Sequence, residues 1–504
     1  RERDGFASGL CVKYFLAKHA NAKTRMNKKI KVLCFTDDVV GRDVEMMLPI
    51  RYFAERFLNC EFYHALNIDI HEIYRQRPDV ILQANTIGSN LYFEISKIAH
   101  EQNIPLFALI SEGNFRTDGS FDYWGFNRDK KFHQEYICCW SERTAEFLRN
   151  EVPEAKDKIV VTGGVGFDRY VIYKFLSKEN FLRKYSSTQF TRIIGYAGWA
   201  FGKLDHKRGR NELLVWAKGD ENKLIWIEEQ RQKVRDILKQ AIVNNPSTLF
   251  ILKQHPQENS PERTEAVKNE MSELAHYKNV LYLCGEESIH DLISVSDLWT
   301  CFESTSALES WLMGKQTIFI NPEKDFNRDP LYKGSALIQN YDEFQKLIDE
   351  FYTSGRIEQF FDKEKRTTRE KLIKDIIGFG DGLNHIRAAN YFQKMINEYF
   401  NADNRQPITD NQPLITNHQS RYNFHFWHWL VYSLIRIAGP FYNRAVYSRL
   451  YKFKKHLWVF ENYKMEKLHK LYERYVPFLD EFYKKNDLQN KFTDEDSFQQ
   501  YNKS

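Results

Sequence analysis

An acidic residue ends an apolar run in the first part of the chain, at PLFALISEG (105–113). Glu112 stands beside Gly113, which lacks a side chain and leaves room for a substrate, so this carboxylate could act as a general base. Burial next to a substrate would raise its pKa toward the working range. The alternative is a turn with a solvated Glu112, which the same letters also describe.

A histidine ends a second apolar run, TLFILKQHP (248–256). The imidazole of His255 can donate a hydrogen bond to a phosphate oxygen and, when protonated, offset charge on a departing phosphate. Pro256 fixes the backbone that presents it, and Lys253 precedes it in the same motif. A strand that merely stops at a histidine, with a helix beginning at Pro256, is the alternative.

Hydroxyl residues follow a third apolar run, at DLWTCFESTSALES (297–310). Ser304, Thr305 and Ser306 would open a helix, where hydroxyls and free backbone N–H groups can hold phosphate. Glu309 lies about one turn further and could reach a ribose hydroxyl. Simple capping of the helix explains the same residues. The sequence has no phosphate-binding loop and no metal-ligand spacing, which favours a metal-independent site.

Strand-like apolar runs alternate with helical segments of 10–23 residues between about residues 29 and 400. The alternation runs from 29 to 175, pauses, and restarts at about 190 with RIIGYAG (192–198). Such a pattern predicts parallel sheets covered by helices on both faces. Ligands of open parallel sheets bind beyond the carboxyl ends of the strands. Each of the three polar clusters follows a predicted strand, in order, and this joint occurrence favours function for all three.

Individual elements can be placed from the same patterns. Strands are expected at 29–36, 78–84, 105–113, 135–141 and 158–164, and in the second half at 192–198, 248–256, 279–285, 297–304 and 316–322. Helices are expected at 49–58, 89–102, 141–152, 222–244, 261–277, 288–296 and 305–315, with further helical segments from 343 to 402. Pro49 is expected in the first turn of its helix.

The composition is that of a soluble globular protein with more than one domain: 504 residues, 42% hydrophobic and 28% charged. Seven cysteines without a C-x-x-C pair indicate reduced, buried thiols in a cytoplasmic protein. We find neither the apolar core of a signal peptide nor an apolar run of about 18 residues that could span a membrane.

The positive charge gathers near the C-terminus, beyond a polar linker predicted at 401–420. Residues 421–470 carry 10 Lys and Arg against 2 Asp and Glu, whereas residues 1–420 carry 58 against 59. Tryptophans and aliphatic residues beside basic ones predict that 421–459 contacts an anionic membrane. The alternative is a helical appendage over 421–485, packed on the rest of the protein, with a polar tail at 486–504. No recognised nucleic-acid-binding motif is present, so nucleic acid is not an expected partner.

These motifs together resemble those of bacterial surface-carbohydrate and capsule biosynthesis proteins over roughly residues 30–400. VTGGVGFD (161–168) is similar to the V-T-G-N-P-x-F-D signature of that family, with Gly164 and Val165 in place of Asn-Pro. LISEG, LKQHP and STSALESWLMGKQTIFINP resemble its acidic-glycine, K-x-H-P and S-T-S motifs. The resemblance implies a GT-B architecture: two Rossmann-like domains (29–175 and 190–400) facing across a cleft, with the donor nucleotide held mainly by the second.

Within that group the motifs resemble sialyltransferases and capsule-type ulosonic acid transferases that use CMP-sugars. The resemblance implies that Glu112 deprotonates an acceptor hydroxyl and that His255 contacts the CMP phosphate and assists its departure. Pro256 would shape that loop. Ser304, Thr305 and Ser306 would hold phosphate and Glu309 the ribose, with Lys253, Gly163 and Gly164 also on the donor side.

We therefore expect a glycosyltransferase that moves a sialic-acid-like or Kdo-like sugar from its CMP form onto a bacterial surface glycan. No cofactor and no metal is expected; the partners are the nucleotide-sugar donor, a glycan or lipid-linked glycan acceptor, and the inner face of the cytoplasmic membrane. Two alternatives stay open: a glycerophosphotransferase using CDP-glycerol, and a non-catalytic GT-B subunit that binds a partner.

Overall fold

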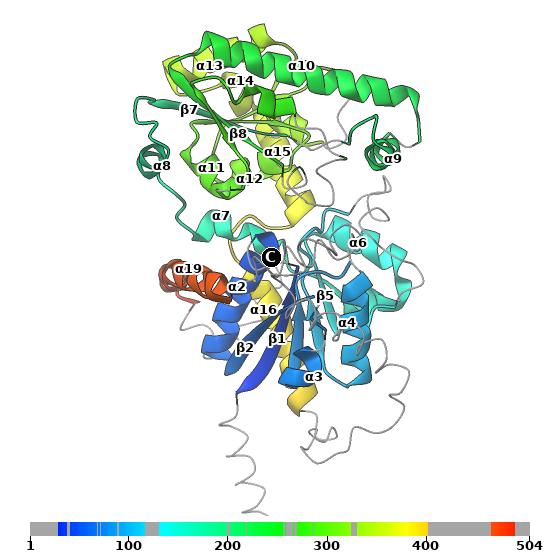
Figure 1. Ribbon diagram of the computed structural model, residues 1–504. Coiled ribbons are helices and arrows are strands. Elements are labelled where there is room, and N and C mark those ends of the chain that lie inside the picture. Colours follow the sequence, from blue (N-terminus) through cyan, green and yellow to red (C-terminus); the bar gives the residue numbers. More distant parts are fainter. Residues whose placement is uncertain are drawn as a thin grey trace, which may run out of the picture.

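Two α/β domains, stacked one on the other, make up the computed structural model (Figure 1). In Figure 1 the first domain is drawn mostly in blue, the second mostly in green, and the short helix α7 (Arg169–Ile172) lies between them. The structure describes residues 29–37, 41–67, 69–70, 72–87, 90–115, 131–198, 202–217, 219–255, 258, 266, 270–285, 287–323, 330–401 and 465–488.

The first domain is built on a six-stranded sheet in which every pairing is parallel, in the order β2-β1-β3-β4-β5-β6. Its central strands are buried on both faces, as the apolar runs predict. The strands are β1 (Ile30–Thr36), β2 (Cys60–Leu66), β3 (Val80–Gln83), β4 (Leu106–Ala108), β5 (Tyr136–Cys139) and β6 (Ile159–Val161). The helices of this part are α2 (Arg42–Phe57), α3 (Glu72–Gln76), α4 (Asn90–Glu101) and α6 (Glu142–Glu151).

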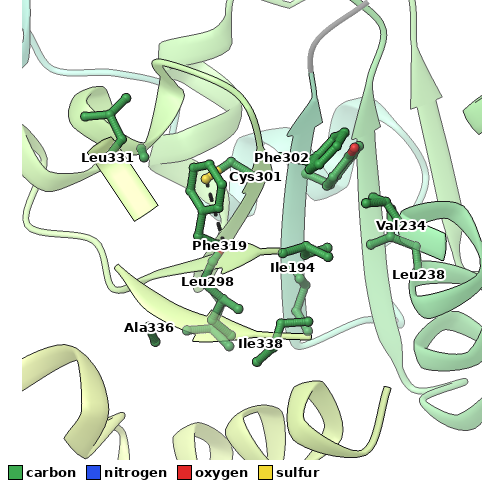
Figure 2. Close-up of a cluster of buried hydrophobic side chains, with 14 of the residues drawn as sticks. Ile194, Val234, Leu238, Leu298, Cys301, Phe302, Phe319, Leu331, Ala336 and Ile338 are labelled. Atoms are coloured by element: carbon green, nitrogen blue, oxygen red, sulfur yellow. Dashed lines mark hydrogen bonds between the residues drawn. The ribbon is translucent and has the colours of Figure 1, made fainter. Parts of the chain in front are cut away.

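The second domain contains another six-stranded parallel sheet, in the order β12-β11-β10-β7-β8-β9. Figure 2 shows side chains from β7, β10, β11 and β12 meeting those of α10 in its core. The strands are β7 (Arg192–Gly198), β8 (Thr248–Lys253), β9 (Val280–Leu283), β10 (Leu298–Phe302), β11 (Thr317–Ile320) and β12 (Ala336–Ile338). The helices are α8 (Lys178–Lys184), α9 (Lys207–Trp216), α10 (Asn222–Asn244), α11 (Ile289–Val295), α12 (Ser306–Leu312), α13 (Tyr341–Ser354), α14 (Glu358–Phe361) and α15 (Lys363–Ile377).

The expected fold class is confirmed: two Rossmann-like domains in the GT-B arrangement. In each sheet the strand order reverses once, between β1 and β3 in the first domain and between β7 and β10 in the second. Ligands of open parallel sheets bind beyond the carboxyl ends of the strands at such reversals. The topology therefore marks one place in each domain where a ligand should be sought.

Some elements differ from the sequence expectation. The strands β2 and β12 were not expected, because β2 includes the polar residues Glu61 and His64 and β12 is only three residues long. Helix α2 begins at Arg42 rather than near Pro49, which lies inside it. About half of the helix expected at 261–277 lies outside the described residues, and residues 270–274 form a 3-10 turn.

Two helices from the C-terminal part of the chain complete the first domain. Apolar side chains of α16 (Asn384–Asn401) and α19 (Met465–Lys485) belong to the same buried cluster as those of β1 and α2. Figure 1 shows α19 beside α2. The domain boundary expected at residue 400 is therefore wrong, because residues 384–401 pack in the core of the first domain.

Helix α19 contacts three parts of the molecule. Asp480 accepts a hydrogen bond of 2.5 Å from Tyr52 of α2, and Tyr475 stacks on Tyr173, after α7, at 4.0 Å between ring centroids. Arg474 lies 3.9 Å from Asp291 of α11, in the second domain. Residues 465–485 of the expected appendage are thus helical and packed. The linker, the tail at 489–504 and the proposed membrane contact at 421–459 lie outside the described residues.

The described cysteines are thiols outside any disulfide, as expected. All are buried except Cys284, which is half-buried, and burial raises the pKa of several of them, for example that of Cys60 to about 12. Thiolates are the reactive form, so the thiols with raised pKa are inert at neutral pH. Within the described ranges, no helix is both long and apolar enough to cross a bilayer.

Candidate functional site

Glu112 lies beyond the carboxyl end of β4, as expected, but its side chain is not buried. It is 55% exposed, and its Oε1 lies 3.5 Å from Nη1 of Arg42, the first residue of α2. The same guanidinium donates to the backbone oxygen of Ser111. Packing explains the glycine at position 113, because a Cβ there would come within 2.9 Å of the Trp140 ring. The burial expected for Glu112 is therefore wrong.

Two further carboxyl groups lie next to the Glu112 loop, at the strand reversal of the first sheet. Asp37 directly follows β1, and Asp43 stands in the first turn of α2. The Tyr92 hydroxyl of α4 lies 2.9 Å from Asp37 Oδ1 and 3.5 Å from Asp43 Oδ2. The side chain of Asn67 donates a further hydrogen bond to Asp37. The sequence analysis did not select either aspartate.

Burial raises the pKa of Asp43 to about 7, and the neighbouring carboxylate of Asp37 contributes to this rise. A hydrogen bond from the Ser111 side chain opposes it. Burial and the two carboxylates hold the pKa of Tyr92 well above its ordinary value, so its hydroxyl stays a donor. Asp37 accepts hydrogen bonds from both Tyr92 and Asn67, and its charge is one cause of the raised pKa of Asp43.

Arg42 connects this region to the second domain. Burial lowers the pKa of its guanidinium, but the carboxylates of Glu112 and Glu309 outweigh this and raise it. Glu309 lies in α12 of the second domain and is 6% exposed. It is hydrogen-bonded by Tyr170, whose pKa is raised by burial and then by this carboxylate. Of the predicted residues, Glu112 thus pairs with this guanidinium, and the charge of Glu309 also raises its pKa.

His255 lies directly beyond β8, half-buried, at the carboxyl edge of the second sheet. Lys253 is the last residue of that strand, and its backbone pairs with β7 and β9. Gln254, between them, is buried, and its Oε1 has no hydrogen-bond partner. Pro256 lies outside the described residues. The expected position of His255 at a strand end is confirmed; its role stays a prediction.

The three hydroxyl residues at the start of α12 differ in what they can offer a ligand. Thr305 is exposed and Ser304 half-buried, whereas Ser306 is buried and its Oγ accepts from the Trp299 indole at 3.0 Å. Ser304 also bonds Ser306, Oγ to Oγ, at 3.0 Å. Just before them, Glu303 has φ +48°, a strained backbone for a residue with a side chain. Ser306 therefore supports the loop, and the hydroxyls of Thr305 and Ser304 are the ones accessible to a ligand.

The two candidate donor groups lie on the same edge of the second sheet. Strand β7 separates β8 from β10, so the ends that carry His255 and Ser304 are two strand spacings apart, about 10 Å. This is the reach of a nucleoside phosphate. Glu309 lies further along α12 and faces the first domain.

Gly163 and Gly164 occupy a packed crossing between the domains. Gly163 has φ +84°, and a Cβ there would lie 1.8 Å from Oδ1 of Asn384 in α16. The Gly164 N–H donates to Ile377 at 2.9 Å, and its carbonyl accepts from Asn384. Asp168, in the same signature, accepts from the backbone N–H of His385 at 2.7 Å. These contacts give both glycines a packing role, and their place on the donor side stays a prediction.

We expect Gly163→Ala to lower the free energy of unfolding by roughly 2–5 kcal/mol, because the left-handed backbone and the collision with Asn384 both oppose a side chain. Gly219→Ala is the matched control, since Gly219 has φ +82° and a Cβ added there would meet nothing within 4 Å. Denaturant unfolding of both variants separates the backbone cost from the collision. Equal effects of the two changes would contradict the packed crossing.

A buried charge network joins the two domains near α7. Arg169 forms an ion pair with Glu45 of α2, and both side chains are less than 10% exposed. His290 of α11 lies 3.9 Å from the same carboxylate. Burial, and then the nearby arginines Arg169 and Arg474, hold the pKa of His290 well below its ordinary value. The network therefore contains one cation, one anion and a neutral histidine.

Within the described residues, no group of three or more His, Cys, Asp or Glu side chains could hold a metal ion. The described part of the chain thus gives no candidate ligand set at either strand reversal. The chemistry available there is that of carboxyl groups in the first domain, and of an imidazole and hydroxyls in the second.

Residues 226–320 match a family model described as "Capsule polysaccharide biosynthesis protein". The matched segment contains His255, the hydroxyl residues at 304–306 and Glu309. It covers less than half of the chain, but it supports a role in polysaccharide biosynthesis. No curated protein sequence matches the chain.

Several solved structures are similar in fold at low identity. A UDP-GlcNAc 2-epimerase from Neisseria meningitidis bound to UDP-GlcNAc is 14% identical, covering 74% of this chain and 100% of its own, with a TM-score of 0.44. The corresponding enzyme from Methanocaldococcus jannaschii is 11% identical, with coverages of 74% and 100% and a TM-score of 0.45. A glycosyltransferase from Rickettsia africae is 12% identical, with coverages of 74% and 99% and a TM-score of 0.38. Likenesses this distant carry no argument about function.

Proposed function

We propose that the protein is a glycosyltransferase of surface-polysaccharide biosynthesis, with a nucleotide-sugar donor on the second domain and a glycan acceptor on the first. One observation carries the proposal: Arg42 pairs with Glu112 of the first domain at 3.5 Å, and the charge of Glu309 in the second domain also raises the pKa of its guanidinium. Both carboxylates follow strands of their sheets, so ligands at the two sheet edges would meet there. The family match over 226–320 supports the polysaccharide context.

The second domain supplies groups suited to a nucleoside phosphate. His255 can donate to a phosphate oxygen that gains charge as the bond to the sugar breaks. Ser304 and Thr305 offer hydroxyls about 10 Å away along the sheet edge, with Ser306 positioning them. Glu309, whose Oε2 is buried without a hydrogen-bond partner, can accept from a hydroxyl of the donor. Lys253, the last residue of β8, stays a predicted donor-side residue, and so does Pro256, which lies outside the described residues.

The first domain supplies carboxyl groups that can deprotonate an acceptor hydroxyl. Glu112 at the loop after β4 is one such group, and Asp43 at the start of α2 is another. We propose a cytidine donor of the CMP-sugar type, with a sialic-acid-like or Kdo-like sugar, because the motifs around Glu112, His255 and Ser304 resemble those of transferases with such donors. The acceptor would be a glycan or a lipid-linked glycan.

We expect CMP to raise the melting temperature of the protein, since a ligand at about 100 times its Kd stabilises the native state by about 2.7 kcal/mol. A panel of CMP, CDP, UDP and GDP tests the base, and release of CMP from CMP-sugars with a lipid-linked acceptor tests the reaction. Stabilisation by UDP alone would contradict the cytidine donor. Turnover of CDP-glycerol alone would show glycerophosphate transfer instead of sugar transfer. The absence of turnover with every donor would contradict the proposal that the protein is a transferase.

A further inference from the structure

The strand reversal of the first sheet carries two carboxyl groups that the sequence motifs do not include. Asp37 follows β1 immediately, and Asp43 lies one residue beyond the start of α2. In open parallel sheets this reversal is where ligands bind. The loop of Glu112 follows β4, one strand beyond β3 in the sheet. The two aspartates are therefore placed where an acceptor bound to the first domain would lie.

Their surroundings give the two carboxyl groups different tasks. Asp37 accepts from Tyr92 and Asn67, so two donors stabilise its negative charge. Asp43 receives a hydrogen bond from Ser111 and a long one, 3.4 Å, from the Asp37 backbone N–H. Asp43 is half-buried rather than enclosed, so a ligand can reach it. Asp37 is thus held by two hydrogen-bond donors, and Asp43 is the carboxyl group whose pKa is raised toward neutrality.

A buried polar atom of the second domain points independently to a ligand in the same cluster. Glu309 is 6% exposed, and its Oε2 is buried without a hydrogen-bond partner. Its charge acts on Arg42, the residue next to Asp43. A buried carboxylate oxygen without a partner costs free energy unless a ligand hydroxyl donates to it. Glu309 thus indicates a hydroxyl-bearing ligand beside α12, on the side of the second domain from which its charge acts on Arg42.

We propose that Asp43 is the general base that takes the proton of the acceptor hydroxyl, with Asp37 as the positioning residue that keeps it basic. This inference rests on the proposed transfer function. In the step, the acceptor oxygen forms a bond to the anomeric carbon of the sugar while its proton passes to the Asp43 carboxylate. The bond from that carbon to the phosphate oxygen breaks, and its electron pair leaves with the nucleoside phosphate.

Asp43 suits this task better than Glu112. The Glu112 side chain is 55% exposed, and its Oε1 is engaged with the Arg42 guanidinium at 3.5 Å. The pKa of Asp43 is raised to about 7, and a general base works best when its pKa lies near the working pH. In this proposal Glu112 is a positioning residue, whose ion pair holds the Arg42 side chain in place.

The charged and titratable groups that face Asp43 come from every neighbouring element. Asp37 after β1 and Glu112 after β4 raise its pKa, and Ser111 lowers it. Tyr92 of α4 approaches from the third side as a neutral hydroxyl. Arg42 precedes it on α2. Removal of the Asp37 charge should therefore lower the pKa of Asp43.

The test is steady-state kinetics of the full chain with a CMP-sugar and an acceptor across pH 5–9. We expect Asp43→Asn to lower kcat by about 100-fold or more, the usual contribution of a general base. Asp79→Asn is the matched control: Asp79 is also half-buried, but it lies at the amino end of β3, where it accepts from the Lys31 N–H. It should keep wild-type turnover.

The pH profile separates a base from a merely structural residue. In the wild type, kcat/KM should rise with pH along a limb with an apparent pKa near 7. Asp37→Asn should move that limb to lower pH, because one negative charge next to Asp43 is lost. Glu112→Gln should move the limb less than Asp37→Asn does, because Asp37 has the larger effect on the pKa of Asp43. A limb that vanishes in Glu112→Gln and persists in Asp43→Asn would overturn the proposal in favour of Glu112.

Thermal unfolding shows whether the Asp43→Asn protein is folded. The raised pKa of Asp43 means that the native state binds a proton more tightly than the unfolded chain, so this group stabilises the fold at low pH and loses that effect as pH rises through about 7. Asp43→Asn should therefore melt no lower than the wild type at pH 8. If the folded variant keeps wild-type kcat, the proposal is wrong; if the wild type transfers no sugar, the proposed function itself fails.

Discussion

Replacing Arg169 with alanine is expected to lower the free energy of unfolding by about 3–5 kcal/mol, the cost of leaving a buried charge without its partner. The partner is Glu45, whose carboxylate is 8% exposed and has His290 as its next neighbour at 3.9 Å. The neutral His290 does not replace the lost cation, because its burial, the largest cause of its lowered pKa, is unchanged by the substitution. Thermal or denaturant unfolding measures the effect.

The exposed pair Lys174–Glu481 is the control for this prediction. It also joins α19 to the segment after α7, but its side chains are 71% and 63% exposed. Lys174→Ala should cost less than about 1 kcal/mol, as exposed ion pairs generally do. A double replacement of Glu45 and Arg169 by methionine should recover much of the loss, since an apolar pair needs no compensation. A wild-type melting temperature for Arg169→Ala would show that the ion pair does not stabilise the fold.

His255→Ala is expected to lower kcat by about 100-fold and to change the KM for the donor much less, as expected for a group that acts mainly on the departing phosphate. The hydrogen bond from the imidazole strengthens as the phosphate oxygen gains charge, so its loss is felt in the transition state. The half-buried position of His255 at the end of β8 leaves it accessible to a ligand at this sheet edge. Initial-rate kinetics with varied donor concentration measure both constants.

His276→Ala provides the comparison. His276 belongs to the same domain but is exposed, with its Nδ1 2.6 Å from the backbone oxygen of Glu273 and its ring beside that of Tyr277. Its replacement should keep kcat within about threefold of the wild type. If His255→Ala and His276→Ala behave alike, the imidazole of His255 takes no part in the reaction, and the motif marks only the end of a strand.

Much of the fold follows from periodicity along the chain. Helix α10 spans Asn222–Asn244 as predicted, because its pattern is long and bounded by polar segments. The strand β7 coincides with the run RIIGYAG. The edge strand β2 was missed, because an edge strand tolerates Glu61 and His64 and so lacks a continuous apolar run. The return of α16 to the first domain could not be read either, since an amphipathic helix does not reveal which domain its apolar face meets.

The candidate site was only partly predictable for a related reason. Glu112, His255 and Ser304 stand at strand ends in recognisable motifs, and the structure places them there. Asp43 has no motif, and its raised pKa depends on Asp37 and on Ser111, which is 68 positions away in the chain. Asp37 directly follows the strand predicted at 29–36. Its position at a strand end therefore marked it as a candidate from the sequence alone. The expectation that Glu112 is buried was wrong. The exposure of its side chain depends on how α2 approaches the loop after β4, which the sequence does not show.

The return of α16 and α19 to the first domain also sets the order in which the protein can be completed during synthesis. The core of that domain includes both Val32 and Leu488. At the usual rates of translation, the ribosome needs about 20–90 s between these two residues. The sheet of the second domain, which ends at Ile338, emerges entirely within that interval. The half that begins first is thus finished last, and until then the apolar face of α2 is a surface on which a chaperone would be expected to act.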